Sequence, residues 1–286
     1  MRFGVREICN VVFKATTARK IGSKSFEKGQ PVMYFDSLKT STMEQATTTA
    51  YAQGGRGNTR LVAWEGEKTL TFTMEDALIS EMGLAILAGA NLYEAKEGDT
   101  LLVHVTETTN KAEVTKAAAS GENLGVKFYA LEMDESGNIV GNPIEVTIDE
   151  TKKVTGIETG KAYLIDYYTE KTSGATQIDI EPQSFGGNFY IEADTLFRDT
   201  DGADHAAQFV IPNGKIQSNF TLSMASSGDP STFTFTVDAF PGYVNGDVTK
   251  KVMATIQIIN DDEDEVAIND VAGDKEDSKE HVIVTD

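Results

Sequence analysis

The sequence predicts a mainly β protein with one short helix, on three observations. Strand-forming residues fill many windows of the chain, and Gly, Asn, Asp and Ser recur between them as turn signals. Apolar and hydroxyl residues alternate with a period of two in 69–74 and in 233–237, as in strands with one buried face. Apolar residues at helical spacing mark one segment, Glu75 to Ala88. At 286 residues, 40% of them hydrophobic, the chain is long enough to bury a sizeable core.

Strand patterns and turn signals place the remaining elements along the chain. The candidate strands are 4–15, 31–38, 69–74, 101–106, 126–132, 144–148, 162–168, 189–197, 208–211, 220–224, 233–237 and 252–259. Asp134 to Asn138 predicts a hairpin turn, and Gly228 to Pro230 predicts a turn that joins 220–224 to 233–237. Residues 111–120 fit a short helix or a loop equally well.

The predicted helix spans Glu75 to Ala88 and packs on the sheet. Its two acidic residues at 75 and 76 suit a helix N-terminus, and Gly89 suits the C-terminal stop. Ser80 could cap a second short turn, so two brief helices remain an alternative. The apolar face expected to reach the core consists of Leu78, Ile79, Met82, Ile86 and Leu87.

Between Lys39 and Arg60 the composition changes to Thr-rich and then Gly-rich sequence. Such a segment offers little apolar area to bury, so we expect an irregular loop that neighbouring subunits order. The glycines could suggest a phosphate site, but a phosphate loop leads directly into a helix and this one leads into a strand. The predicted inter-subunit residues are Thr47, Tyr51, Gly54, Gly55, Arg56, Gly57, Asn58 and Arg60.

The chain is strongly acidic, with a net charge of -20 and a pI near 4.5. This argues against a conventional nucleic-acid binder and against docking on anionic lipid, which both need a basic surface. Residues 261–286 hold 11 acidic and 2 basic side chains and form a distinct C-terminal segment. It reads either as a mobile solubilising tail or as an arm in which Val282, Ile283 and Val284 add to the edge of a neighbouring subunit.

Signals for enzymatic chemistry are weak. The three histidines, His104, His205 and His281, lie far apart in the sequence, and we expect neither a metal site nor a cofactor. The acidic run from Asp199 to Asp204 could wrap calcium, although a polar hairpin loop explains it better. The single cysteine, Cys9, lies in an apolar run and reads as a buried hydrophobe. The N-terminus lacks a signal-peptide pattern, and no apolar run is long enough to span a membrane.

Several blocks of sequence, in their order along the chain, resemble a family of bacteriophage tail tube or major tail proteins. They are Asp36–Thr42, Tyr51–Asn58, Leu61–Trp64, Thr71–Ser80, Leu84–Ala90, Ile211–Leu222 and Gly228–Phe233. Together they cover about half of the chain, and the section from about 100 to 185 carries less of the resemblance. The resemblance implies a tail-tube-like β-sandwich or half-barrel with the short helix (about 75–88) packed on it and with extended loops.

The resemblance also implies a structural virion protein rather than an enzyme. Six copies would close into a ring, and stacked rings would form the tube through which DNA passes without specific binding. The expected partners are further copies of the chain and other tail proteins (a sheath if the tail contracts, a tape measure, a terminator), and not a membrane. The protein would be assembled in the host cytoplasm and located in the virion tail.

The resemblance divides the chain into a β domain at 1–260, with a β-rich elaboration at about 100–185, and the acidic segment at 261–286. Two other functions remain open: a capsid decoration or baseplate protein, and a non-viral β-rich adhesion or carbohydrate-binding module. The adhesion module would need aromatic residues gathered on one exposed face, and Trp64, Tyr167 and Tyr168 show no such pattern in the sequence.

Overall fold

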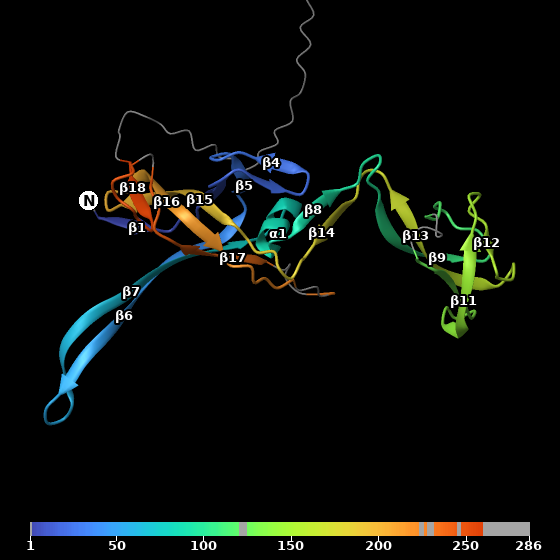
Figure 1. The fold of residues 1–286 in the computed structure, drawn as a ribbon, viewed down its shortest axis with the longest axis horizontal. Coiled ribbons are helices and arrows are strands. Elements are labelled where there is room, and N and C mark those ends of the chain that lie inside the picture. The colour runs from blue at the N-terminus through green and yellow to red at the C-terminus, as the bar shows by residue number, and fades with distance from the viewer. Residues whose placement is uncertain (1, 120–124, 223–225, 228–231, 245–246, 260–286) are drawn as a thin grey trace, which may run out of the picture.

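The computed structural model describes residues 2–119, 125–222, 226–227, 232–244 and 247–259. The fold is mainly β, with 58% of the residues in strands and 3% in a helix, which confirms the predicted fold class. Figure 1 shows three parts along the molecule: a central body, a long two-stranded hairpin that projects from it, and a smaller sheet at the other end.

The body is a nine-stranded antiparallel sheet with the order β5-β2-β15-β16-β17-β7-β6. Two short strands complete it, since β1 pairs with one half of β15 and β18 with one half of β16. The bounds are β1 (Phe3–Val5), β2 (Asn10–Ala15), β5 (Pro31–Phe35), β6 (Leu38–Gly54), β7 (Thr59–Asp76), β15 (Asn188–Asp199), β16 (Asp204–Ile216), β17 (Phe233–Ala239) and β18 (Thr255–Ile258).

The sheet curls into a half-barrel around an apolar core. Alternate residues of its strands point inward, among them Phe13, Phe189 and Phe235, which are fully buried. The rings of Phe35 in β5 and Phe235 in β17 lie 4.8 Å apart, so strands far apart in the sheet order meet across the interior. Cys9 is buried at one end of this core, as expected from its apolar surroundings.

The helix α1 (Glu81–Ala88) packs against this core, but it begins six residues later than predicted. Asp76 ends β7, paired with Phe233, so the two acidic residues assigned to the helix N-terminus belong to a strand. Ser80 caps α1, accepting a 2.9 Å hydrogen bond from the N–H of Gly83, and Gly89 ends it in the left-handed region with φ of 63°. The alternative of two brief helices is therefore wrong.

The five predicted helix residues divide accordingly. Ile86 and Leu87 are buried in the core, and Met82 and Ile79 pack against it half-buried. Leu78 lies outside the helix with 71% of its surface exposed, so its predicted core position is wrong. The cause is the longer strand, which shifts the helical register by placing Leu78 in the connection after β7.

A second sheet of five strands is attached to the body through a ribbon of β8 (Asn91–Glu94) and β14 (Thr176–Asp179). Its order is β12-β11-β10-β13-β9, and we call it the appended sheet (residues 101–171). The bounds are β9 (Leu101–Thr109), β10 (Phe128–Met133), β11 (Ile139–Ile148), β12 (Val154–Thr155) and β13 (Ala162–Lys171). A minor hairpin, β3 (Arg19–Ile21) and β4 (Lys24–Phe26), lies on the body.

Of the turns and strands predicted from local sequence patterns, some are confirmed and others are wrong. The hairpin at Asp134 to Asn138 is confirmed, because it joins β10 to β11. The predicted pairing of 220–224 with 233–237 is wrong, since β17 pairs with β7 and β16 and Phe220 to Leu222 form no strand. The turn at 228–230 lies outside the described residues. Residues 111–119 cross the appended sheet as irregular chain, and the strand predicted at 4–15 is split into β1 and β2.

Candidate assembly surface: the β6–β7 arm

The irregular loop predicted for Lys39 to Arg60 is instead half of a long β-hairpin. β17 pairs with β7 only from Thr71 to Asp76, and beyond that point β6 and β7 pair only with each other. We call this free part, residues 46–69, the arm. At a rise of about 3.3 Å per residue it is roughly 30 Å long. Figure 1 shows it projecting from the body. The Thr- and Gly-rich composition predicts a loop because it offers little apolar area to bury. The segment nevertheless forms strands, because a ladder of backbone hydrogen bonds needs no apolar core.

The arm ends in a tight turn that its glycines make possible. Gly55 and Gly57 have φ of 79° and 90°, and Asn58 has φ of 50°, all in the left-handed region that glycine and asparagine tolerate best. The N–H of Asn58 donates to the carbonyl of Gly55 at 3.2 Å. The glycine-rich segment therefore reverses the chain between two strands and does not precede a helix.

Bulges twist the arm near its base and near its turn. The pairing register shifts between Thr47 and Thr49, where the N–H of Glu67 donates to Oγ1 of Thr48 at 2.9 Å. A Cβ at Gly66 would stand 2.5 Å from that hydroxyl oxygen, so a larger residue would force the Thr48 side chain to move and would break this hydrogen bond. The sequence thus specifies the shape of the arm at defined points.

Apolar side chains occupy both faces of the arm near its end. Ala50 lies opposite Trp64 and Ala52 opposite Val62, so these four share one face, while Tyr51 lies opposite Ala63 on the other. Tyr51, Leu61, Val62 and Trp64 are 41%, 65%, 50% and 56% exposed. An isolated two-stranded hairpin is at best marginally stable in water. Two exposed apolar faces on such a hairpin indicate a surface that another chain covers.

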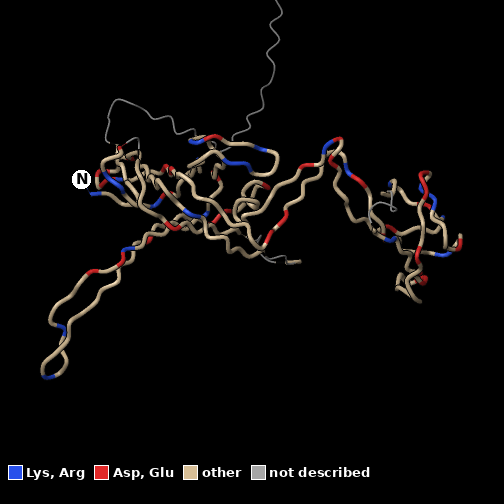
Figure 2. The backbone as a smooth tube through the Cα atoms, in the orientation of Figure 1, with Lys and Arg blue, Asp and Glu red and all other residues tan. Residues whose placement is uncertain are grey.

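The charge of the arm's end differs from that of the chain as a whole. Between Tyr51 and Trp64 there are two arginines, Arg56 and Arg60, and no carboxylate, although the net charge of the chain is -20. The guanidinium of Arg60 stacks 4.0 Å from the centroid of the Tyr51 ring. Figure 2 shows these basic positions at the far end of the arm, away from the acidic positions along its length.

The eight residues predicted as an inter-subunit loop all lie in the arm. Thr47, Tyr51 and Gly54 are in β6, Arg60 is in β7, and the other four form the turn. The prediction stopped at Arg60 and so missed the next residues of β7, Leu61, Val62 and Trp64; Val62 and Trp64 pair with Ala52 and Ala50 of β6. The short apolar run 61–64 was the available signal. Val282, Ile283 and Val284 lie outside the described residues.

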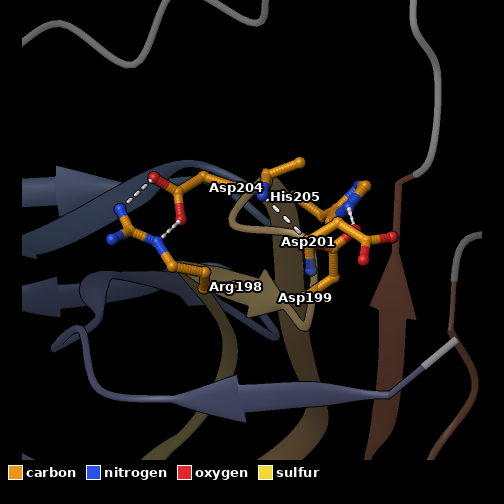
Figure 3. Close-up of polar contacts among 6 residues, drawn as sticks. Arg198, Asp199, Asp201, Asp204 and His205 are labelled. Carbon is orange, nitrogen blue, oxygen red and sulfur yellow. Dashed lines mark hydrogen bonds and ion pairs between the residues drawn. The ribbon is translucent and has the colours of Figure 1, made fainter.

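The acidic run at 199–204 forms the hairpin turn between β15 and β16, as Figure 3 shows. Oδ1 of Asp199 accepts from the N–H groups of Asp201 and Ala203 at 2.8 and 3.0 Å, and Oδ2 lies 3.1 Å from Nε2 of His205. These bonds, that to His205 first, lower the pKa of Asp199. The preferred interpretation as a polar hairpin loop is confirmed.

Other charged and histidine side chains that could serve a metal site or catalysis also form local pairs. Asp204 holds Arg198 through two 2.6 Å hydrogen bonds, visible in Figure 3. His104 pairs with Asp166 at 2.7 Å on the surface of the appended sheet. Among the described residues no group of three or more His, Cys, Asp or Glu side chains could hold a metal ion. The described part also contains no helix long and apolar enough to cross a membrane.

Comparison with known families assigns this architecture. The family model described as the YomU/Tube protein family matches residues 20–258, which include the arm, the helix and the appended sheet. The chain belongs to the YomU/Tube protein family. It is thus a phage tail-tube-like structural protein, of a family whose role implies self-association and no catalysis. A comparison with curated proteins finds no match.

Proposed function

We propose that this YomU/Tube protein is the tube subunit of a phage tail, six copies closing into a ring and rings stacking into the conduit for DNA. The observation that carries the proposal is the arm. It is a hairpin with apolar side chains on both faces and no partner within the described part of its own chain. Such a surface is stable only when neighbouring copies cover it.

The half-barrel and the charge of the chain support the same function. A curved sheet with the edge strands β5 and β6 can be continued by the sheets of adjacent copies around a central hole. A net charge of -20 repels phosphate, so DNA would pass through the lumen without binding to its wall. The remaining partners would be other tail proteins, such as a tape measure, a terminator and, in a contractile tail, a sheath. Assembly would take place in the host cytoplasm.

The test is negative-stain microscopy of the purified full chain over a range of concentrations. We expect rings and tubes with a central hole, seen end-on with sixfold symmetry. Trp64 is the single tryptophan of the chain and lies half-exposed on the arm. Its fluorescence maximum should therefore shift to shorter wavelength as tubes form. Particles without a hole, or a monomer at every concentration, would contradict the proposal.

For the acidic C-terminal segment we propose a role between rings. Five successive carboxylates at 261–265 repel one another, while Val282 to Val284 have strand propensity and can extend an exposed sheet edge of an adjacent copy. Truncation after Asn260 should leave rings but make long tubes scarce or fragile on dilution. Tubes of normal length and stability from the truncated chain would show that the segment is a solvated appendage.

A further inference from the structure

The half-barrel carries an open apolar groove lined by residues of β1 and β18. Figure 1 shows these two strands at the end of the body away from α1. Its volume is about 500 Å³. One wall is formed by Phe3, Val5 and Ile256, which are 45%, 60% and 54% exposed. The other wall consists of the base of the arm hairpin, with Met43, Leu70 and Phe72. Its lining includes one charged side chain, Glu7.

We propose that the groove of one copy receives the arm end (residues 51–64) of a second copy. This deepens the proposed tube function and rests on it. The arm end presents large apolar side chains that are 41–65% exposed, and the groove presents an apolar cavity of matching chemistry. Both surfaces are exposed in the monomer, so the groove of one copy and the arm end of another can form one interface.

Charge favours this occupant as well. The arm end carries Arg56 and Arg60 without a carboxylate, whereas the one charged side chain that lines the groove is the carboxylate of Glu7. A basic arm end therefore meets a groove with one acidic side chain, Glu7, on an acidic protein. The acidic C-terminal segment, the other candidate occupant, lacks this complementarity.

Geometry directs the arm end to another copy. The groove includes the base of the arm, so the continuous β6–β7 ladder holds the two surfaces roughly 30 Å apart within one chain. Contact between two different patches is head-to-tail and closes a ring when the rotation between copies permits. Tyr51 and Trp64 are 41% and 56% exposed, so burying what remains of their surface removes roughly 150–250 Å² on one partner, about a quarter of the ~800 Å² per partner in a stable interface. The shaft of the arm supplies further area.

Disulfide trapping in the full chain tests the proposal. In a Cys9→Ala background we would place Val5→Cys in the groove of one sample and Val62→Cys on the arm of another, then mix and oxidise them. Both positions are at least half exposed, so neither substitution disturbs the core. Because Cys9 is buried, the same substitutions in the native background provide a second set should Cys9→Ala fail to fold. The matched control pairs Val62→Cys with Ser136→Cys, an exposed turn residue of the appended sheet.

We expect at least roughly tenfold more covalent dimer from the groove pair than from the control pair. A chain carrying both cysteines should give a ladder of covalent oligomers that ends at the ring size. Tubes in the microscope with cross-linking no higher than the control would overturn the groove assignment and leave the tube function standing. Cross-linking that appears only after truncation at Asn260 would also overturn it, because the C-terminal segment would then occupy the groove. A protein that forms no assembly would overturn both.

Discussion

The arm and the appended sheet are two excursions from one body, and they are stabilised in opposite ways. Each leaves the body as a two-stranded ribbon, and they lie at opposite ends of the molecule (Figure 1). The appended sheet has its own core, formed by Val114, Phe128, Ala130, Val146, Val154, Tyr163, Ile165 and Tyr167. The arm, from residue 46 to residue 69, has no buried side chain. The appended sheet can therefore be stable by itself, whereas the arm lacks a core of its own, and the proposed assembly role of the arm rests on this difference.

Removing the arm is expected to have the largest effect. Thr47 and Lys68 face each other in the ladder, so replacing residues 48–67 with Asn-Gly closes a two-residue hairpin turn at that point. The body should stay folded with an unchanged thermal midpoint, because the removed segment holds no core residue. Sedimentation should show that the concentration needed for assembly rises by about a hundredfold or more, equivalent to about 2.7 kcal/mol per contact. Normal tubes from this variant would remove the distinction between the two regions.

A matched pair of tyrosine substitutions compares the regions at single residues. Tyr167 is fully buried in the appended sheet, and Tyr51 is 41% exposed on the arm. Urea denaturation of the fragment 95–175 should show that Tyr167→Ala lowers the free energy of unfolding by about 3–5 kcal/mol. Tyr51→Ala in the dilute monomer should change it by less than about 0.5 kcal/mol. Equal losses would mean that the arm is stabilised within its own chain.

Alkaline pH provides a smaller effect that is specific to the appended sheet. The hydroxyl of Tyr167 donates to Glu107 at 3.0 Å, and burial followed by this carboxylate raises its pKa to about 12. Glu107 also accepts two 2.6 Å hydrogen bonds from Thr115, which hold the irregular segment 111–119 on the sheet. Desolvation would raise the pKa of Glu107, but these hydrogen bonds lower it overall. Both shifts arise from one partly buried polar link between Tyr167, Glu107 and Thr115.

The sign of the pH effect follows from the raised pKa of Tyr167. Its contribution is fully present below the unfolded pKa of about 10 and is lost as the pH rises to about 12, because the unfolded chain releases the proton first. Across that window the fragment 95–175 should lose stability about 1.4 kcal/mol per pH unit more steeply than its Tyr167→Phe variant. The variant removes the proton and keeps the ring, so lysine titration cancels in the comparison. Parallel profiles for the two proteins would contradict this assignment.

The same contrast explains what could be predicted from the sequence. Elements that bury an apolar face, such as 69–74 and 233–237, show their periodicity and were predicted correctly. The arm has no buried face, so its Thr- and Gly-rich strands carry no period-two signal and read as a loop. The helix start was misplaced because pairing of Asp76 with β17, a contact distant in sequence, extends the preceding strand. The groove brings together residues from both ends of the chain, which no local pattern reveals.

The smallest expected effect on assembly comes from removing the appended sheet. Glu94 and Thr176 are the last pair of the β8–β14 ribbon, so replacing residues 95–175 with Asn-Gly closes the ribbon without unpairing it. The excised segment has a separate core, and the body core has no member in 101–171. We therefore expect the shortened chain to form tubes at the same concentration as the full chain. In micrographs these tubes should have a smaller outer diameter. The fragment 95–175 alone should unfold cooperatively. A shortened chain that is folded yet monomeric would place the appended sheet in the interface, and the arm would no longer be the distinguishing assembly element.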